Sequence, residues 1–335
     1  RPCSCCQLPM PNTILLPLLA SGHFVSGQEL AAALGVSRTA VWKQLKKLSD
    51  LGLHIESVKG RGYRIPGGID LLQEEAVRNA MTPQSLALLG HLDLRDSTGS
   101  TNAEAMQQIR EGAAAGYVCT AEQQSAGRGR RGREWVSPYA RNLYVSAVWE
   151  YSGGAAVLEG MSLAVGVAVA RALRKCSVPP VQLKWPNDVL ADGAKLGGIL
   201  LEMTGDAAGV CQVVVGIGLN VDMPGEQGAD IDQAWTDVAR WCHGDRPSRS
   251  VLLGTLLDEL LPLLASFEQT GFTPWREEWQ SLDAYAGQAV VLQSAGQQMA
   301  GVARGVDGRG ALQLETAASG VQSVFGGEIS MRPLS

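Results

Sequence analysis

The chain has 335 residues, of which 45% are hydrophobic and 18% charged, with a formal net charge of −5. These values are typical of a soluble globular protein with room for two or three domains, and the net charge alone does not indicate a nucleic-acid partner. No apolar run approaches the length of a membrane span, and the short apolar run at 14–19 contains a proline and lacks the basic flank of a secretory signal.

The seven cysteines do not form the spaced pairs expected of a zinc site. Three of them crowd into residues 1–11, which we interpret as an irregular leader, with Met10 as a candidate natural start. The other four lie in apolar or mixed surroundings and are typical of small core residues in a reducing, cytoplasmic compartment.

Residues 12–67 have the pattern of a winged helix-turn-helix. Ser26 and Glu29 form a capping-box sequence at the start of one helix, Gly35 supplies the turn, and Ser37 caps a second helix. A glycine-rich tip at 59–62, between short apolar runs, predicts a β-hairpin.

Basic residues concentrate in this module: from Ser37 to Arg64 there are seven lysines and arginines and two acidic residues. They gather on the second helix and on the hairpin tip, the electrostatic footprint of DNA binding. The alternative is a small interaction domain with a solvated polar face. The predicted DNA-binding residues are Ser37, Arg38, Thr39, Trp42, Lys43, Lys46, Lys59 and Arg61.

Residues 68–90 are predicted to be a linker helix and loop, and residues 91–286 a mixed α/β domain. Strand and helix patterns alternate in this domain, which is typical of a core with both elements. Strands are expected at 117–121, 143–148, 181–185, 195–203 and 211–217, and helices at 103–109, 157–175 and 251–267.

The segment from Gln124 to Trp135 holds four arginines and three glycines within seven residues. Glycines let the backbone approach a ligand, and arginines among exposed amides suit phosphate or carboxylate. We therefore predict that residues 124–135 form a mobile loop, called here the arginine loop, that closes over an anion. Its Gly-x-Gly-x-x-Gly match is a false dinucleotide signature, because no strand runs straight into it and no helical pattern follows.

Polar clusters interrupt the apolar strands of this domain. Ser100-Thr101-Asn102 precedes a helix, and a lysine ends a buried strand in Lys184-Trp185-Pro186-Asn187-Asp188. A buried lysine needs either Asp188 or a bound anion as its partner. A second cation precedes a glycine pair in Lys195-Leu196-Gly197-Gly198, and Gly216-Ile217-Gly218-Leu219-Asn220 ends another strand. Each cluster alone is compatible with a purely structural role.

Residues 287–335 contain short β-type runs separated by glycine turns, with a strong hairpin signal at Asp307-Gly308. This pattern predicts a small barrel. The strands are expected at 289–293, 299–306, 311–315, 321–325 and 328–331.

Together the loop and the polar clusters resemble the bifunctional biotin–protein ligases that double as biotin operon repressors, the biotin–[acetyl-CoA-carboxylase] ligase family. The resemblance runs from the winged module to the C-terminus. It implies an α+β multidomain fold with a class II synthetase-like ligase core and an SH3-like C-terminal barrel. The doubled Ser97-Thr98 before Ser100-Thr101 departs from the pattern, and we favour the second pair as the ligand contact because Asn102 completes it.

The resemblance also implies activation of biotin by ATP and Mg²⁺ to biotinyl-5′-AMP, followed by transfer to a lysine of the biotin carboxyl carrier protein. Lys184, Arg128 and Arg130 are the expected catalytic residues. The expected biotin-binding residues are Ser100, Thr101, Asn102, Gln124, Gly127, Arg128, Arg130, Trp135, Lys184 and Gly198. The expected nucleotide-binding residues are Arg128, Arg130, Arg133, Lys184, Asn187, Asp188, Asn220 and Trp235.

For Trp235, ordinary packing is the alternative to folding over the adenine. The implied partners are operator DNA and, with the adenylate bound, a second copy of the chain. Two other functions compete with this one: a transcription factor that only senses a small anion, and a lipoate ligase on the same core. The arginine loop and the winged module both weigh against lipoate.

Overall fold

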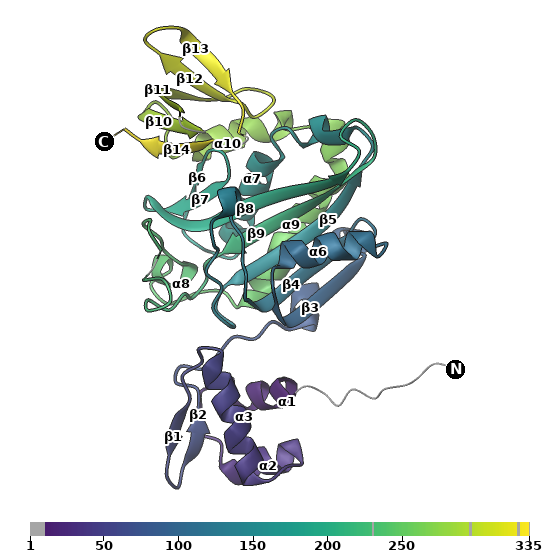
Figure 1. Ribbon diagram of the computed structural model, residues 1–335, viewed down its shortest axis with the longest axis vertical. Coiled ribbons are helices and arrows are strands. Elements are labelled where there is room, and N and C mark those ends of the chain that lie inside the picture. The colour runs from purple at the N-terminus through teal and green to yellow at the C-terminus, as the bar shows by residue number, and fades with distance from the viewer. Residues whose placement is uncertain (1–10, 230, 295–296, 327–328, 335) are drawn as a thin grey trace. The chain divides into compact units, whose positions relative to one another are not determined.

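The computed structural model describes residues 11–229, 231–294, 297–326 and 329–334 (Figure 1). It divides into two compact units. The first comprises the chain up to Leu71 together with Pro138–Arg141, and the second comprises Leu72–Ser137 and the chain from Asn142 onward. Residues 72–90, predicted to be a linker, therefore belong to the second unit.

In the part that the structure describes, the first unit has three helices and a hairpin. They are α1 (Pro11–Leu19), α2 (Gly27–Leu34), α3 (Arg38–Asp50), β1 (Glu56–Val58) and β2 (Gly62–Arg64). The predicted capping box is confirmed, since Glu29 N–H donates to Ser26 Oγ (3.1 Å) and Ser26 N–H donates to Glu29 Oε2 (2.8 Å). Helix α1 was not predicted as a separate element.

Helix α3 presents two chemically different faces. Val41, Leu45 and Leu48 are buried in the unit's apolar core. The eight predicted DNA-binding side chains are all exposed, on α3, at its N-cap Ser37 and on the hairpin tip. The indole of Trp42 is 54% exposed, with Lys46 Nζ 5.9 Å from its ring centre.

The second unit is built on a seven-stranded sheet of order β3-β4-β5-β9-β8-β7-β6. Only β3 and β4 pair in parallel; the remaining neighbours are antiparallel. The strands are β3 (His91–Thr98), β4 (Tyr117–Gln124), β5 (Leu143–Tyr151), β6 (Gln182–Lys184), β7 (Asp188–Ala191), β8 (Ala194–Gly205) and β9 (Cys211–Leu219). The sequence pattern missed β3 and β7.

Helices cover the two faces of this sheet unequally (Figure 1). Helices α7 (Met161–Lys175) and α9 (Arg249–Thr270) cover one face and, with α4 (Glu74–Asn79) and α5 (Pro83–Leu88) against α9, enclose the main apolar core. On the other face, α6 (Thr101–Arg110) covers only part of the sheet, packing on β4, β5 and β9. The predicted helix at 157–175 is divided in two, because Gly160 has φ 72° and separates a 3₁₀ turn from α7.

The sheet face that α6 only partly covers has open space because β9 carries glycines on that side. In β9, Val213, Val215 and Ile217 point into the main core, whereas Gly216 and Gly218 point to the α6 side. A strand alternates its side chains between faces, so glycines at alternate positions remove bulk from one face only. The α6 side of the sheet is therefore hollow where β5, β8 and β9 lie together.

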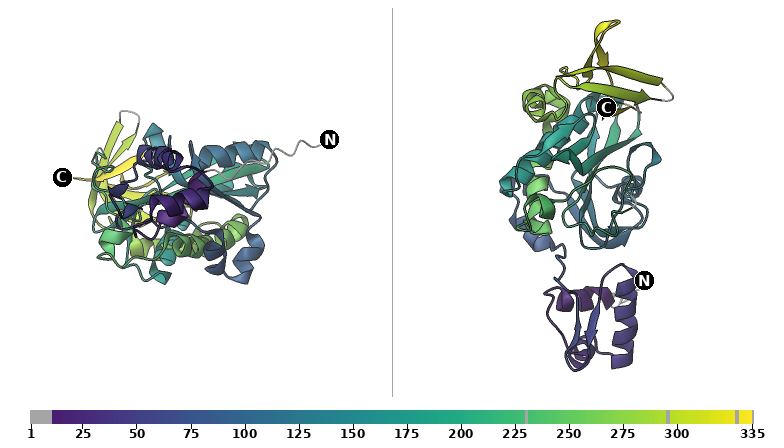
Figure 2. Two further views of the ribbon diagram at one scale, coloured as in Figure 1. Left: turned by 90° about the horizontal axis from the view of Figure 1, so that it is seen from below. Right: turned by 90° about the vertical axis from the view of Figure 1, so that its left-hand side faces the viewer.

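The chain ends in a five-stranded antiparallel sheet of order β13-β12-β11-β10-β14. Its strands are β10 (Ala289–Ser294), β11 (Gln297–Val306), β12 (Leu312–Thr316), β13 (Gly320–Val324) and β14 (Ser330–Pro333). The predicted turn at Asp307-Gly308 joins β11 to β12, and the predicted start of the last strand at 328 lies outside the described residues. This sheet packs beside α10 (Arg276–Leu282), as Figure 2 shows. A short helix, α8 (Val238–Trp241), follows the loop after β9.

Two helical stretches, Gly154–Lys175 and Arg249–Thr270, are long and apolar enough to cross a membrane by length and composition, contrary to the expectation from sequence. Both are core helices, with 61% of the apolar window buried in each. Burial inside the second unit accounts for their apolar character.

Candidate functional site

A cavity of about 370 Å³ opens on the hollow face of the sheet. Its lining brings together segments far apart in the sequence: the start of α6, the arginine loop, the β6–β7 turn, β8, β9 and β14. The predicted ligand-binding residues that line it are Ser100, Thr101, Asn102, Gln124, Arg128, Arg130, Arg133, Trp135, Lys184, Asn187, Asp188 and Gly198. Gly127, Asn220 and Trp235 lie outside this lining.

The arginine loop lies between β4 and β5 and folds back on itself through two backbone hydrogen bonds. Trp135 N–H donates to the Gly127 carbonyl (2.9 Å), and Gly129 N–H donates to the Arg133 carbonyl (2.7 Å). A Cβ on Gly127 would lie 2.4 Å from the Trp135 carbonyl oxygen, so this close approach requires glycine. Strand β4 runs to Gln124, further than predicted, but a single 3₁₀ turn (Arg130–Gly132) follows in place of the helix of a dinucleotide site.

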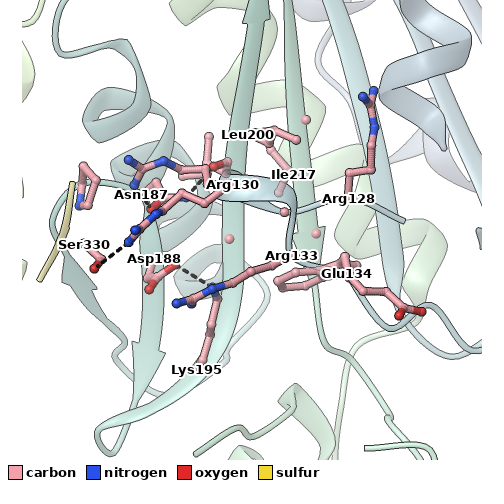
Figure 3. Close-up of a pocket in the computed structure, with 18 of the residues that line it drawn as sticks. Arg128, Arg130, Arg133, Glu134, Asn187, Asp188, Lys195, Leu200, Ile217 and Ser330 are labelled. Carbon is pink, nitrogen blue, oxygen red and sulfur yellow. Dashed lines mark hydrogen bonds and ion pairs between the residues drawn. The ribbon is translucent and has the colours of Figure 1, made fainter. Parts of the chain in front are cut away.

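Arg130 links the arginine loop to two other segments; its contact with Asn187 is drawn in Figure 3. Its Nη1 donates to Asn187 Oδ1 (2.9 Å), and its Nη2 donates to the carbonyls of Gly326 (3.3 Å) and Ile329 (3.1 Å). The guanidinium therefore joins the β6–β7 turn to the segment before β14. Its rigid fork of donors suits such bridging.

Lys184, Lys195 and Asp188 form a charged group on the cavity wall. Lys195 Nζ lies 2.7 Å from Asp188 Oδ1, and Lys184 Nζ lies 3.6 Å from Asp188 Oδ2. Burial lowers the pKa of Lys184, and the charges of Lys195 and Arg332 lower it further, while Asp188 opposes the shift. Of the two partners that the sequence suggested for Lys184, Asp188 is present, but it is nearer to Lys195. In Figure 3 Arg133 reaches toward the Asp188–Lys195 pair, whereas Arg128 and Glu134 point away from it.

The indole of Trp135 forms an apolar wall. Its ring would lie 2.5 Å from a Cβ on Gly218 and 3.3 Å from one on Gly198, so these glycines make its position possible. Lys195 Nζ lies 5.5 Å from the ring centre. The indole N–H is buried without a hydrogen-bond partner among the described residues.

One end of the cavity, called here the polar end, is formed by Thr101, Gln124 and their hydrogen-bond partners. Thr101 N–H donates to Gln124 Oε1 (2.9 Å), and Gln124 Nε2 donates to Ser137 Oγ (3.0 Å). Thr101 and Asn102 begin α6 after Ser100, whereas Ser97 and Thr98 end β3 outside the cavity lining. Of the two pairs, Ser100-Thr101 lines the cavity and Ser97-Thr98 does not.

Two predicted nucleotide residues are engaged elsewhere. Trp235 donates from its indole N–H to the Gly228 carbonyl (2.9 Å) and stacks with Arg240, whose guanidinium carbon lies 4.1 Å from the ring centre. Asn220 donates to the Thr236 carbonyl (3.0 Å). Both therefore organise the loop between β9 and α8, and Asp232 and Gln233 of that loop line the cavity.

Several candidate residues were given no role from sequence. Lys195 was noted as a cation before a glycine pair but was not assigned to the site. Arg332 sits on β14, and only the packing of the C-terminal sheet brings it to the cavity. Ser146 on β5 and Glu202 on β8 join the polar end through Asn102, which requires knowing the strand register.

Profiles of known families match three stretches of the chain. The biotin/lipoate A/B protein ligase family matches residues 95–220, an HTH domain matches residues 12–64, and the biotin protein ligase C-terminal domain matches residues 285–332. The second match confirms the predicted helix-turn-helix. Among the described residues, no group of three or more histidine, cysteine or acidic side chains is placed to hold a metal ion.

The chain is similar to full-length relatives. The bifunctional ligase/repressor BirA of Escherichia coli is 38% identical, over 96% of this chain and 98% of the relative. That of Bacillus subtilis is 30% identical, over 93% and 95%. The solved structure of the Aquifex aeolicus biotin protein ligase in complex with biotin and ATP is 26% identical with a TM-score of 0.62, covering 73% of this chain and all of that one.

Proposed function

The chain belongs to the family of the bifunctional ligase/repressor BirA proteins and is a biotin protein ligase with a helix-turn-helix repressor domain; on this basis we propose how its cavity performs the reaction. The biotin carboxylate attacks the α-phosphorus of ATP, and pyrophosphate leaves to give biotinyl-5′-AMP. An amine of the biotin carboxyl carrier protein then attacks the acyl carbon, and AMP leaves. The amine loses a proton as the amide forms.

The observation that carries this proposal is the gathering of cations on one cavity. Lys184, Lys195, Arg130, Arg133 and Arg332 all line it. Biotin carboxylate and ATP are both anions and repel each other, so positive charge and alignment are what the protein must supply. A site built this way needs no nucleophile of its own.

We assign roles by position. Lys184 and Lys195 flank Asp188 on the cavity wall, and we expect them to contact the carboxylate and the α-phosphate oxygens. Arg130 and Arg133 serve the phosphates and the adenylate, and Arg128 closes the loop. The polar end around Thr101 and Gln124 takes the ureido ring of biotin, with Trp135 along its apolar part.

Mg²⁺ is expected to arrive with ATP and to be held mainly by its phosphates, because Mg²⁺ commonly uses few protein ligands. Bound there, it neutralises phosphate charge. Asp188 and Asn187 are oxygen donors in the cavity lining, yet Asp188 pairs with two lysines and Asn187 Oδ1 accepts from Arg130. They therefore fit a positioning role around the nucleotide better than a dedicated metal cage.

The exposed cations of α3 and of the hairpin tip are proposed to contact operator DNA. One such helix binds weakly and mostly through phosphate charge, so specific repression requires a dimer that places two helices on two half-sites. The adenylate, by ordering surface loops of the second unit, would favour that dimer and act as corepressor. Unmodified carrier protein would compete by consuming the adenylate.

The finer architecture is also a proposal. The five-stranded C-terminal sheet, with a register shift between Ala303 and Val306, fits an SH3-like barrel. The mixed sheet with helices on both faces fits a class II synthetase-like core. We also propose a cytoplasmic location, which is supported by Cys119, Cys176, Cys211 and Cys242 forming no disulfide among the described residues.

The direct test is ATP–pyrophosphate exchange by the full chain with biotin, with lipoate and with neither. Exchange that depends on biotin supports the assignment. Exchange that depends equally on lipoate would favour a lipoate ligase. Binding of either acid without exchange would indicate a sensor that performs no activation.

A further inference from the structure

Glu202 lies beside the polar end of the cavity but does not line it. It points from β8 to the α6 side of the sheet, where its Oε2 accepts hydrogen bonds from Asn102 Nδ2 (2.8 Å) and Arg128 Nη2 (3.1 Å). Asn102 occupies this place because Gly216 lies beneath it: a Cβ there would be 2.2 Å from Asn102 Oδ1. A carboxylate is thereby joined to the start of α6.

A chain of hydrogen bonds continues inward from Asn102. Its Oδ1 lies 2.6 Å from Ser146 Oγ, and Ser146 Oγ lies 2.8 Å from Thr101 Oγ1. Thr101 Oγ1 is also 3.1 Å from Gln124 Oε1. Ser146 is fully buried and Thr101 is 3% exposed, so water cannot readily replace the partners in this series of hydrogen bonds.

The direction of these hydrogen bonds is determined by Glu202. An ionised carboxylate only accepts, so the amide nitrogen of Asn102 must face it and the amide oxygen must face Ser146. That oxygen cannot donate, so the single proton of Ser146 goes to Asn102. Ser146 Oγ can then only accept from Thr101.

Thr101 has one hydroxyl proton and two neighbouring acceptors, Ser146 Oγ and Gln124 Oε1. Gln124 presents its oxygen here because Thr101 N–H donates to it. The contact between Ser146 Oγ and Thr101 Oγ1 could use the proton of either hydroxyl, but the proton of Ser146 is already donated to Asn102. Among the described residues, Thr101 Oγ1 therefore keeps its lone pairs for a ligand. The polar end of the cavity therefore offers acceptors.

We propose that Glu202 is a positioning residue that sets ligand specificity: acting through Asn102 and Ser146, it makes Thr101 a hydrogen-bond acceptor. This inference rests on the proposed function and names the feature of the acid that the cavity selects, a ring that carries N–H donors. The cyclic urea of biotin has them. The dithiolane ring of lipoate has none, so it would leave these buried acceptors unpaired.

A site that hydrogen-bonds its substrate can reject an analogue lacking the matching group by a factor on the order of 10⁴. Glu202→Gln keeps the volume but lets the amide present either a donor or an acceptor to Asn102, so the chain of hydrogen bonds can run in either direction. Part of the variant population would then present a donor at Thr101. Biotin would bind that population poorly.

The test is calorimetric titration of the full chain with biotin, which requires no catalysis, alongside biotin-dependent exchange. Glu202→Gln should raise the Kd and the KM for biotin about threefold to tenfold, the effect of roughly one hydrogen bond, with kcat within a factor of about two. The ratio of kcat/KM for biotin to kcat/KM for lipoate should fall by the same factor. Ser146→Ala interrupts the series of hydrogen bonds between Glu202 and Thr101. In that background Glu202→Gln should therefore raise the Kd for biotin little further.

Glu150→Gln is the matched control, because Glu150 is another strand carboxylate that accepts from an amide, Gln212 Nε2 (2.7 Å), outside the cavity. It should leave the Kd for biotin unchanged. A Glu202→Gln chain that binds biotin as tightly as the wild type, or whose effect adds fully to that of Ser146→Ala, would overturn the proposal. A wild-type chain that binds biotin but performs no exchange would instead overturn the proposed function.

Discussion

Arg249 and Glu122 form a buried ion pair at the edge of the second unit. Arg249 Nη1 donates to Glu122 Oε2 (2.6 Å), and the two side chains are 0% and 5% exposed. The same guanidinium donates to the Asn142 carbonyl, and Leu72 N–H donates to Glu122 Oε1 (2.6 Å). The pair thus fastens the first residue of the unit to β4, two residues before Gln124.

Replacing Arg249 by methionine should destabilise the second unit by about 3–5 kcal/mol, because it leaves a buried carboxylate without its partner. Urea unfolding followed by tryptophan fluorescence measures the loss. Arg304→Met breaks an exposed arginine–glutamate pair with side chains 50% and 44% exposed, and should cost about 0–1 kcal/mol. Equal losses in the two variants would contradict a structural role for the buried pair.

Lys184→Ala should reduce biotin-dependent exchange roughly a hundredfold while the fold survives, since one preorganised charge at a reacting centre contributes about 3 kcal/mol. Lys175→Ala is the control, because Lys175 forms its ion pairs on the surface of α7. Exchange within a factor of about two of the wild type in Lys184→Ala would place this lysine away from the reacting atoms.

The lowered pKa of Lys184 predicts a particular pH dependence. Burial and neighbouring cations make the free enzyme lose this proton at lower pH than an ordinary lysine, so kcat/KM should fall on the alkaline side below the usual lysine range. Bound carboxylate and phosphate favour the charged form, so kcat should persist to higher pH. Lys184→Arg should move the alkaline limb of kcat/KM upward, because arginine stays charged. Coincident limbs for kcat and kcat/KM in the wild type would argue against Lys184 as the titrating group.

Arg130→Ala should release biotinyl-5′-AMP early, because the bridge from the loop to Asn187 and the C-terminal sheet is lost. The same is expected of Arg128→Ala, through loss of loop closure. The measurable result is biotinylation of unrelated proteins added to the reaction, compared with Arg174→Ala, whose side chain is 70% exposed. Tight retention of the adenylate by the loop variants would count against a clamp.

The sequence predicted the parts of this site that are encoded locally. The arginine loop, the Lys184 turn and the Ser100-Thr101 start of a helix are each contiguous, so residue types and spacing identify them. Lys195 and Arg332 meet Lys184 only through strand order and packing of the C-terminal sheet. The link from Glu202 to Thr101 depends on which strand faces coincide, information that spacing alone does not carry.

The fold, like the site, was predicted from sequence where it is encoded locally and missed where it depends on packing. Patterns of apolar residues located most strands, but β7 is short and β3 is polar at several positions, so neither was recognised. Residues 72–90 look like a connection because α4 and α5 are short. Their burial becomes evident only where Val77 and Met81 join the core beside α9.

We propose that one intermediate, made in the cavity of the second unit, serves both acyl transfer and repression. The direct measurement is binding to DNA from upstream of the source organism's biotin synthesis genes, with no ligand, with biotin, and with biotin plus ATP and Mg²⁺. We predict tight, cooperative binding under the third condition, weaker binding with biotin alone, and the weakest without ligand. Equal affinity under all three conditions would contradict the claim and leave a ligase whose DNA-binding domain does not respond to its product.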